Sequence, residues 1–115
     1  MAEANPDCLF VFGDNEKKFG CGGQASIRYC SNAYGIPTKK SPTMANSAFF
    51  TDSEYDKNVA HIDKAIANIP SGYDTIVFPS DGLGTGLAEL PKRAPKTYAY
   101  LVSAINKRFG KLYDL

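Results

Sequence analysis

Two glycine-rich stretches, each following a short apolar run, constrain this chain more than any other feature. The first begins at Gly13 after residues 9–12 and continues through residues 20–24, Gly-Cys-Gly-Gly-Gln. The second, residues 79–86, reads Pro-Ser-Asp-Gly-Leu-Gly-Thr-Gly and follows residues 75–78. Glycine lets backbone amides approach a ligand closely, and amides that converge at a helix N-terminus form an anion site. Two such loops at the ends of neighbouring strands are expected to hold a diphosphate between them.

Apolar runs alternate with amphipathic stretches along the chain. Residues 8–13, 34–39 and 73–79 have the composition of short strands, and Pro37 places the second strand at an edge of the sheet or ends it early. Helices are expected over 23–33, over 52–69 and, after Pro91 and Pro95, up to Gly110. This order predicts an α/β fold with a mainly parallel sheet, in which ligands bind beyond the carboxyl ends of the strands.

Two local patterns add detail to this prediction. Thr51 and Glu54 have the spacing of a capping box, which predicts that they close the N-terminus of the second helix. Phe49 and Phe50 lie in a stretch without period, and packing in the core is favoured over stacking on a ligand.

Composition limits the classes of function. The 115 residues make one domain, 1–115, and a net charge of +1 gives no basic field for nucleic acid. No apolar run approaches the roughly 20 residues that span a bilayer, and residues 1–7 lack a signal pattern. We therefore expect a cytoplasmic protein without membrane contact. Three cysteines and one histidine show no zinc spacing, so no metal and no cofactor are expected.

Polar residues of the loops are candidates for ligand contacts. Asp14 and Asn15 can read a base or ribose edge, or can form an Asx-turn that closes the strand. Asp81 either shapes its turn or contacts ribose hydroxyls. The predicted ligand-binding residues are Gly13, Asp14, Asn15, Gly20, Gly22, Gly23, Gln24, Pro79, Asp81, Gly82, Leu83, Gly84, Thr85 and Gly86.

Lysines follow the second strand at the same edge. Lys39 or Lys40 can bind phosphate or, when desolvated, act as an amine nucleophile toward a sugar carbon; solvated loop lysines are the alternative. Arg93, near the start of the last helix, has the position of an ordinary solvated charge.

In order and spacing, these motifs resemble the macrodomain family of ADP-ribose-binding modules. The resemblance covers residues 8–109 and rests on the glycine loops and on the run Ile-Pro-Thr-Lys-Lys at 36–40. It is strongest toward small macrodomains that remove terminal ADP-ribose from carboxylate side chains or DNA bases, and toward small macro-like proteins of bacteriophages. It implies a three-layer α/β/α fold of reduced size.

The resemblance also implies residue roles. Asp14 corresponds to the aspartate that binds the adenine amine, and residues 82–86 to the loop around the diphosphate. Lys39 or Lys40 falls at the position of the lysine nucleophile. The hydrolysing branch has an acid directly after Gly-Leu, whereas this chain has Ala88 there, so Glu89 becomes the candidate acid or base.

Two functions follow from these observations. In the first, the protein hydrolyses ADP-ribose from a modified protein or nucleic acid, with Lys39, Lys40 and Glu89 as candidate catalytic residues. In the second, it captures ADP-ribose or a related adenine nucleotide without turnover, for example to blunt a host defence. Gly84→Val and Gly22→Val are expected to abolish binding and to leave the fold largely intact.

Overall fold

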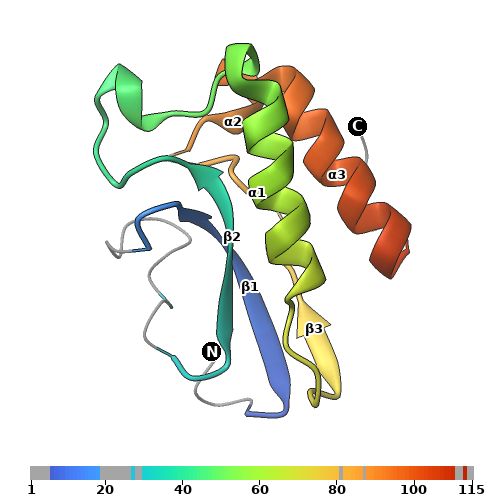
Figure 1. The fold of residues 1–115 in the computed structure, drawn as a ribbon. Coiled ribbons are helices and arrows are strands. Elements are labelled where there is room, and N and C mark those ends of the chain that lie inside the picture. The colour runs from blue at the N-terminus through green and yellow to red at the C-terminus, as the bar shows by residue number, and fades with distance from the viewer. Residues whose placement is uncertain are drawn as a thin grey trace.

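Three parallel strands form the sheet on which the fold is built (Figure 1). The computed structural model describes residues 6–18, 27, 30–80, 82–86, 88–110 and 113. The strands are β1 (Cys8–Asn15), β2 (Ala33–Lys39) and β3 (Thr75–Val77), in the order β2-β1-β3. The sequence therefore predicted all three strands, and Pro37 lies in a strand at the edge of this sheet. The third strand is shorter than the apolar run that predicted it.

Helices α1 (Tyr55–Ala67) and α3 (Pro95–Phe109) pack against each other over the sheet, and the short α2 (Leu90–Arg93) precedes α3 (Figure 1). One core cluster joins strand side chains to both long helices; its members include Val11, Ile36, Ile62, Leu101 and Ile105. These findings confirm the α/β class and the parallel sheet. The predicted helix over 23–33 lies mostly outside the described residues, and its last residue instead begins β2.

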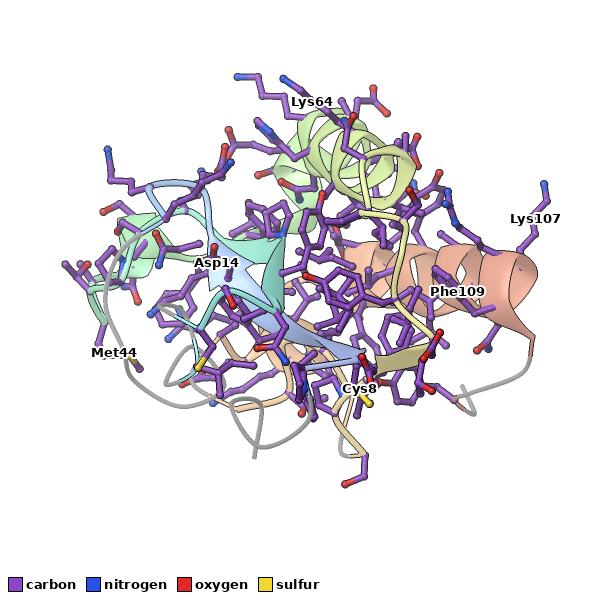
Figure 2. All side chains as sticks on the ribbon, turned by 90° about the horizontal axis from the view of Figure 1, so that it is seen from below. Cys8, Asp14, Met44, Lys64, Lys107 and Phe109 are labelled. Carbon is purple, nitrogen blue, oxygen red and sulfur yellow. The ribbon has the colours of Figure 1, made fainter. Side chains whose placement is uncertain are left out.

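Aromatic side chains from several parts of the chain pack in the core. Phe49 and Phe50 are each 1% exposed, which confirms that they pack in the interior. At the far end of α3, Phe109 lies beside β3 and packs on Phe78 with ring centres 5.2 Å apart, whereas Lys107 projects outward (Figure 2). The amphipathic pattern of α3 therefore describes its packing correctly.

The prediction of a capping box at Thr51 and Glu54 is wrong. The Thr51 hydroxyl contacts the Ser53 hydroxyl at 2.7 Å, Glu54 pairs with Lys40, and α1 begins only at Tyr55. The carboxylate of Asp52 instead accepts hydrogen bonds from the amides of Lys96 and Thr97, both at 3.0 Å. Asp52, to which the capping-box pattern gave no role, thus stabilises the N-terminus of α3.

Candidate functional site

The carboxyl ends of β1 and β2 meet at one edge of the sheet, and the chain after β3 crosses to the same edge. Asn15 and Lys39 are paired in register there. Gly84 of the crossing chain lies so close to Thr38 that an added Cβ atom would be 2.9 Å from Thr38 Cβ, and the Thr38 hydroxyl donates to the Asp14 carbonyl at 3.2 Å. The topology thereby brings the second glycine loop over the end of β2.

The end of β1 contains an Asx-turn. The side-chain oxygen of Asn15 accepts a hydrogen bond from the Lys17 amide at 3.0 Å, and Asp14 Oδ1 accepts one from the Asn15 amide at 2.7 Å. Asp14 and Asn15 are 8% and 6% exposed. The turn interpretation is therefore correct for Asn15, and both residues have structural partners whether or not they also meet a ligand.

Gly35 is a site residue that the sequence analysis missed. A Cβ atom at Gly35 would lie 2.5 Å from Asp14 Oδ2 and 2.7 Å from Asp14 Cβ. The Asp14 side chain therefore lies against the bare backbone of β2. A glycine inside a strand was the available signal, because it marks a close approach of another group.

The second glycine loop is held from both sides. The Gly82 amide donates to the Pro79 carbonyl at 3.2 Å, and the Tyr113 hydroxyl donates to the same oxygen at 2.6 Å. Burial raises the pKa of Tyr113 to about 12. Leu83 is 2% exposed and belongs to the core, so its side chain anchors the loop. Gly82 and Gly84 have φ of +98° and +77°, which other residues rarely adopt.

Further along this loop, the backbone turns toward α2. Thr85 Oγ1 donates to the Gly82 carbonyl at 3.1 Å, and the Leu90 amide donates to the Gly84 carbonyl at 2.9 Å. Gly86 is exposed. Within the described residues, the backbone amides of 83–86 donate to no protein acceptor. The loop therefore presents donors of the kind that bind an anion.

Lys39 lies among charged and apolar side chains at the end of β2. We call this group the Lys39 cluster: Lys39, Met44, Phe49, Glu89 and Arg93. Lys39 Nζ lies 3.5 Å from Met44 Sδ and 4.6 Å from the centre of the Phe49 ring. The Arg93 guanidinium lies 3.6 Å from the same ring centre, and Arg93 Nε donates to Glu89 Oε1 at 3.1 Å. The structure thus brings together two of the three predicted catalytic residues, Lys39 and Glu89.

Burial lowers the pKa of the Lys39 amine. The Glu89 carboxylate opposes this shift and the Arg93 guanidinium adds to it, but burial dominates. Lys39 is 6% exposed, an uncommon state for a lysine. A larger fraction of neutral amine makes a lysine a better nucleophile near neutral pH.

Glu89 has a backbone conformation that is uncommon for a residue with a side chain. Its φ is 48°, in the left-handed region, and it precedes the first residue of α2. Such strain costs about 1–2 kcal/mol and tends to occur at functional sites. The strained backbone places the carboxylate within reach of Arg93 and close enough to Lys39 to affect its pKa.

Lys40 is placed differently from its neighbour. Its ammonium pairs with Glu54, and its amide donates to the Ala48 carbonyl at 2.7 Å. The structure therefore separates the two lysines that the sequence left as equivalent candidates.

Arg93 is not the ordinary solvated charge that the sequence suggested. Its side chain is 28% exposed and bonds to Glu89, and its Nη1 donates to Asn46 Oδ1 at 3.2 Å. The spacing of four residues between Glu89 and Arg93 was the signal for this pair. Met44 and Phe49 carry no comparable signal, because their stretch has no period.

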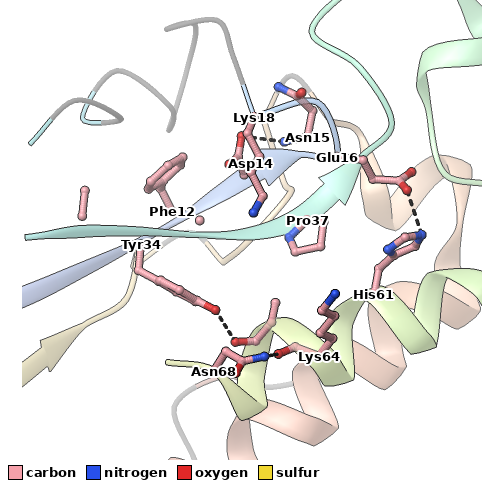
Figure 3. Close-up of a pocket in the computed structure, with 13 residues that line it drawn as sticks. Phe12, Asp14, Asn15, Glu16, Lys18, Tyr34, Pro37, His61, Lys64 and Asn68 are labelled. Atoms are coloured by element: carbon pink, nitrogen blue, oxygen red, sulfur yellow. Dashed lines mark hydrogen bonds and ion pairs between the residues drawn. The ribbon is translucent and has the colours of Figure 1, made fainter. Parts of the chain in front are cut away.

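A hollow, which we call the edge groove, wraps around the outer side of β2 (Figure 3). Its volume is about 770 Å³, within the roughly 300–1,000 Å³ typical of small-molecule sites. His61 Nε2 and Glu16 Oε1 pair across it at 2.8 Å, and the Tyr34 hydroxyl donates to the Ala65 carbonyl at 2.6 Å. The lining residues are Phe12, Asp14, Asn15, Glu16, Lys18, Ala33, Tyr34, Gly35, Pro37, His61, Lys64, Ala65 and Asn68.

Comparison with known proteins places the chain in a family. Residues 1–104 match a family described as "Family of unknown function (DUF7831)". The chain belongs to this family. No curated protein and no solved structure matches it.

Several of the predicted site residues of this DUF7831 chain fall outside the described residues: Gly20, Gly22, Gly23, Gln24 and Asp81. In the described part of the chain, no group of three or more His, Cys, Asp or Glu residues could hold a metal. Among the same residues, no helix has the length and apolarity to cross a membrane. Lys39 and Glu89 are the candidate site residues, and the Glu89 amide donates to the Gly86 carbonyl of the second glycine loop at 3.0 Å.

Proposed function

We propose that this protein binds ADP-ribose or a related adenine nucleotide at the carboxyl edge of its sheet, and that Lys39 releases ADP-ribose from a modified protein or nucleic acid. The proposal includes a macro-like fold of three layers and reduced size. The observation that carries it is the buried Lys39 amine of lowered pKa, beside Glu89, at the end of a parallel strand.

The nucleotide part of the proposal is supported by the second glycine loop. Its amides at 83–86 donate to no acceptor among the described residues, and they can donate to phosphate oxygens. Asp14, at the end of β1, is the proposed partner of the adenine amine. Gly35 keeps the backbone of β2 clear of that carboxylate.

The catalytic part assigns a covalent step to Lys39. The neutral amine forms a bond to C1″ of the ribose while the bond from C1″ to the target breaks, and the target leaves with the electron pair. The ribose ring then opens as a proton passes from the nitrogen to the ring oxygen, which gives the imine that borohydride reduces. Glu89 gives a proton to the leaving group and later takes one from the water that frees ADP-ribose from the lysine. Arg93 orients the Glu89 carboxylate.

One observation favours capture without turnover. The Glu89 carboxylate is already bonded to Arg93, and residue 88, where the hydrolysing macrodomains carry an acid, is Ala88. In that function the amides of the loop hold the diphosphate and Lys39 contributes only charge.

Binding is tested first, by calorimetry with ADP-ribose, AMP and ribose 5-phosphate. Micromolar binding of ADP-ribose and much weaker binding of the two fragments are expected, because the loop contacts the diphosphate. No heat with ADP-ribose, together with clear binding of an unrelated nucleotide, would contradict the proposal.

Turnover is tested by release of ADP-ribose from ADP-ribosylated protein and DNA, with borohydride to trap a lysine adduct. Lys39→Ala is expected to stop release and trapping while binding survives, and Glu89→Gln to slow release by about two to four orders of magnitude. Lys40→Ala is the matched control, because its ammonium pairs with Glu54, and it should release at the wild-type rate. Binding without release by the wild-type protein would establish capture instead.

A further inference from the structure

Met44 is an exposed residue in contact with a buried one. It is 54% exposed and lies at the periphery of the molecule (Figure 2), yet its sulfur is 3.5 Å from the amine of Lys39, which is 6% exposed. The Met44 side chain is thus exposed to solvent and also contacts the Lys39 amine through its sulfur.

The segment that carries Met44 is attached on both sides of it. Before Met44, the Lys40 amide donates to the Ala48 carbonyl at 2.7 Å. After it, Asn46 accepts from Arg93 at 3.2 Å, and Phe49 forms an antiparallel bridge with Lys39. These contacts hold the loop over the end of β2 and keep the sulfur close to the amine.

The partners of the Lys39 amine within the described residues are weak. A thioether sulfur is a poor hydrogen-bond acceptor, and the Phe49 ring offers only its face. Both therefore do little to offset the burial that lowers the pKa of Lys39. A stronger acceptor in place of the sulfur would stabilise the ammonium form.

Oxidation of methionine supplies such an acceptor. A peroxide transfers one oxygen atom to the sulfur, which is oxidised to the sulfoxide, while the peroxide is reduced and leaves as water or an alcohol. The sulfoxide is polar, and sulfoxide reductases reverse the change. Met44 is accessible to peroxide because more than half of its surface is exposed.

We infer that Met44 is a reversible oxidation site that controls the reactivity of Lys39. The sulfoxide oxygen accepts a hydrogen bond from the Lys39 ammonium, holds the amine in its charged form and makes it a poorer nucleophile. The inference concerns the amine itself and does not depend on which ligand the protein binds.

The test compares Lys39 reactivity before and after treatment of the folded protein with dilute hydrogen peroxide. A thiol reductant then restores reversibly oxidised cysteines, trace acetylation with acetic anhydride labels amines, and mass spectrometry locates both changes. Acetylation of Lys39 is expected to slow about tenfold in molecules that carry the sulfoxide, since each unit of pKa changes the fraction of free amine tenfold. Lys40 in the same digest is the internal reference and should keep its rate.

Two variants make the result specific. Met44→Leu keeps an apolar cover without an oxidisable sulfur, so peroxide should leave its Lys39 rate unchanged. Met44→Gln places an amide oxygen near the amine and should slow acetylation without peroxide. The inference is overturned if the Met44 sulfoxide forms and Lys39 reacts at the same or a higher rate, if peroxide also slows Lys39 in Met44→Leu, or if Met44 resists oxidation.

Discussion

The Lys39 cluster and the edge groove flank the same strand and both contain a buried charged residue, Lys39 and Asp14, but their ion pairs differ in setting. In the cluster, a lysine that is 6% exposed has a lowered pKa and weak partners. In the groove, His61 and Glu16 pair while 48% and 30% of their side chains stay exposed. Burial also raises the pKa of Tyr34 in the groove, so a shifted pKa does not by itself separate the two regions. What marks the cluster is a lysine of lowered pKa near a carboxylate, a combination expected at functional sites.

The two regions also differ in what they cost the fold. The cluster contains a buried amine and a left-handed Glu89, both unfavourable for stability. The groove has a surface ion pair and a satisfied tyrosine hydroxyl, but it also includes a left-handed residue, Lys18, with φ of 57°. The buried Lys39 amine is unfavourable for stability, and such unfavourable local features are expected at functional sites.

The largest expected effect is a loss of stability that differs between a glycine next to the Lys39 cluster, Gly84, and a glycine of the edge groove, Gly35. Gly84→Ala places a Cβ atom 2.9 Å from Thr38 Cβ and 3.1 Å from Leu90 Cβ, at a φ of +77°. We expect the free energy of unfolding to fall by about 2–4 kcal/mol, measured by urea denaturation. In Gly35→Ala the three atoms nearest to the new Cβ atom all belong to the Asp14 side chain, and no positive φ adds strain, so the loss should be smaller, about 1–2 kcal/mol.

Gly86→Ala is the control for this pair, because its Cβ atom would have no neighbour within 4 Å. A loss for Gly35→Ala that exceeds the loss for Gly84→Ala would reverse the comparison. Because of these contacts, Gly84→Val is expected to destabilise the fold as well as the loop, which corrects the expectation drawn from the sequence.

An effect of intermediate size is expected at Asp52, whose carboxylate caps the N-terminus of α3. Helix α3 follows directly after α2, the helix that carries Arg93. Burial alone would raise the pKa of the Asp52 carboxyl, but the amides of Lys96 and Thr97, the Thr97 hydroxyl and the Lys96 charge together lower it. A lowered pKa in the folded state means that the ionised carboxylate stabilises the fold. That contribution is complete above the unfolded pKa of about 3.9 and is lost as the pH falls through the folded value.

Asp52→Ala is therefore expected to lower the free energy of unfolding by about 1 kcal/mol at pH 7. The difference from wild type should shrink below about pH 4, where the carboxyl takes up a proton. Denaturant unfolding at several pH values measures both, with the exposed Ser53→Ala as control. A difference that stays constant down to pH 2 would contradict the role of the charge.

The smallest effect is expected in the edge groove. His61→Gln removes an exposed ion pair with Glu16, and such pairs contribute about 0–1 kcal/mol. The change in the free energy of unfolding should lie at the low end of that range and fall further in high salt. A loss comparable to that of Asp52→Ala would mean that the groove is held as firmly as the end of β2.

Local patterns in the sequence were sufficient for the elements of the fold. Apolar runs predicted β1, β2 and β3, and steps of three and four residues predicted α1 and α3. These predictions succeed because the period of buried residues depends only on the geometry of a strand or a helix. The burial of Phe49 and Phe50 followed from composition and not from a period, because these aromatic side chains are too apolar for an exposed loop.

The tertiary structure alone decided which polar residues act together. Asp52 caps a helix that begins more than 40 residues later, and the Glu89 carboxylate acts on the pKa of Lys39 across a similar separation. Lys39 and Lys40 are adjacent in sequence, but one is buried in the cluster and the other pairs with Glu54. Neighbours in a strand point to opposite sides, and their partners depend on which loops the topology brings over each side. The sequence by itself therefore determined the strands, the helices and the candidate residues at the strand ends, and the tertiary structure decided that Lys39 is buried beside Met44 and Phe49 whereas Lys40 pairs with Glu54.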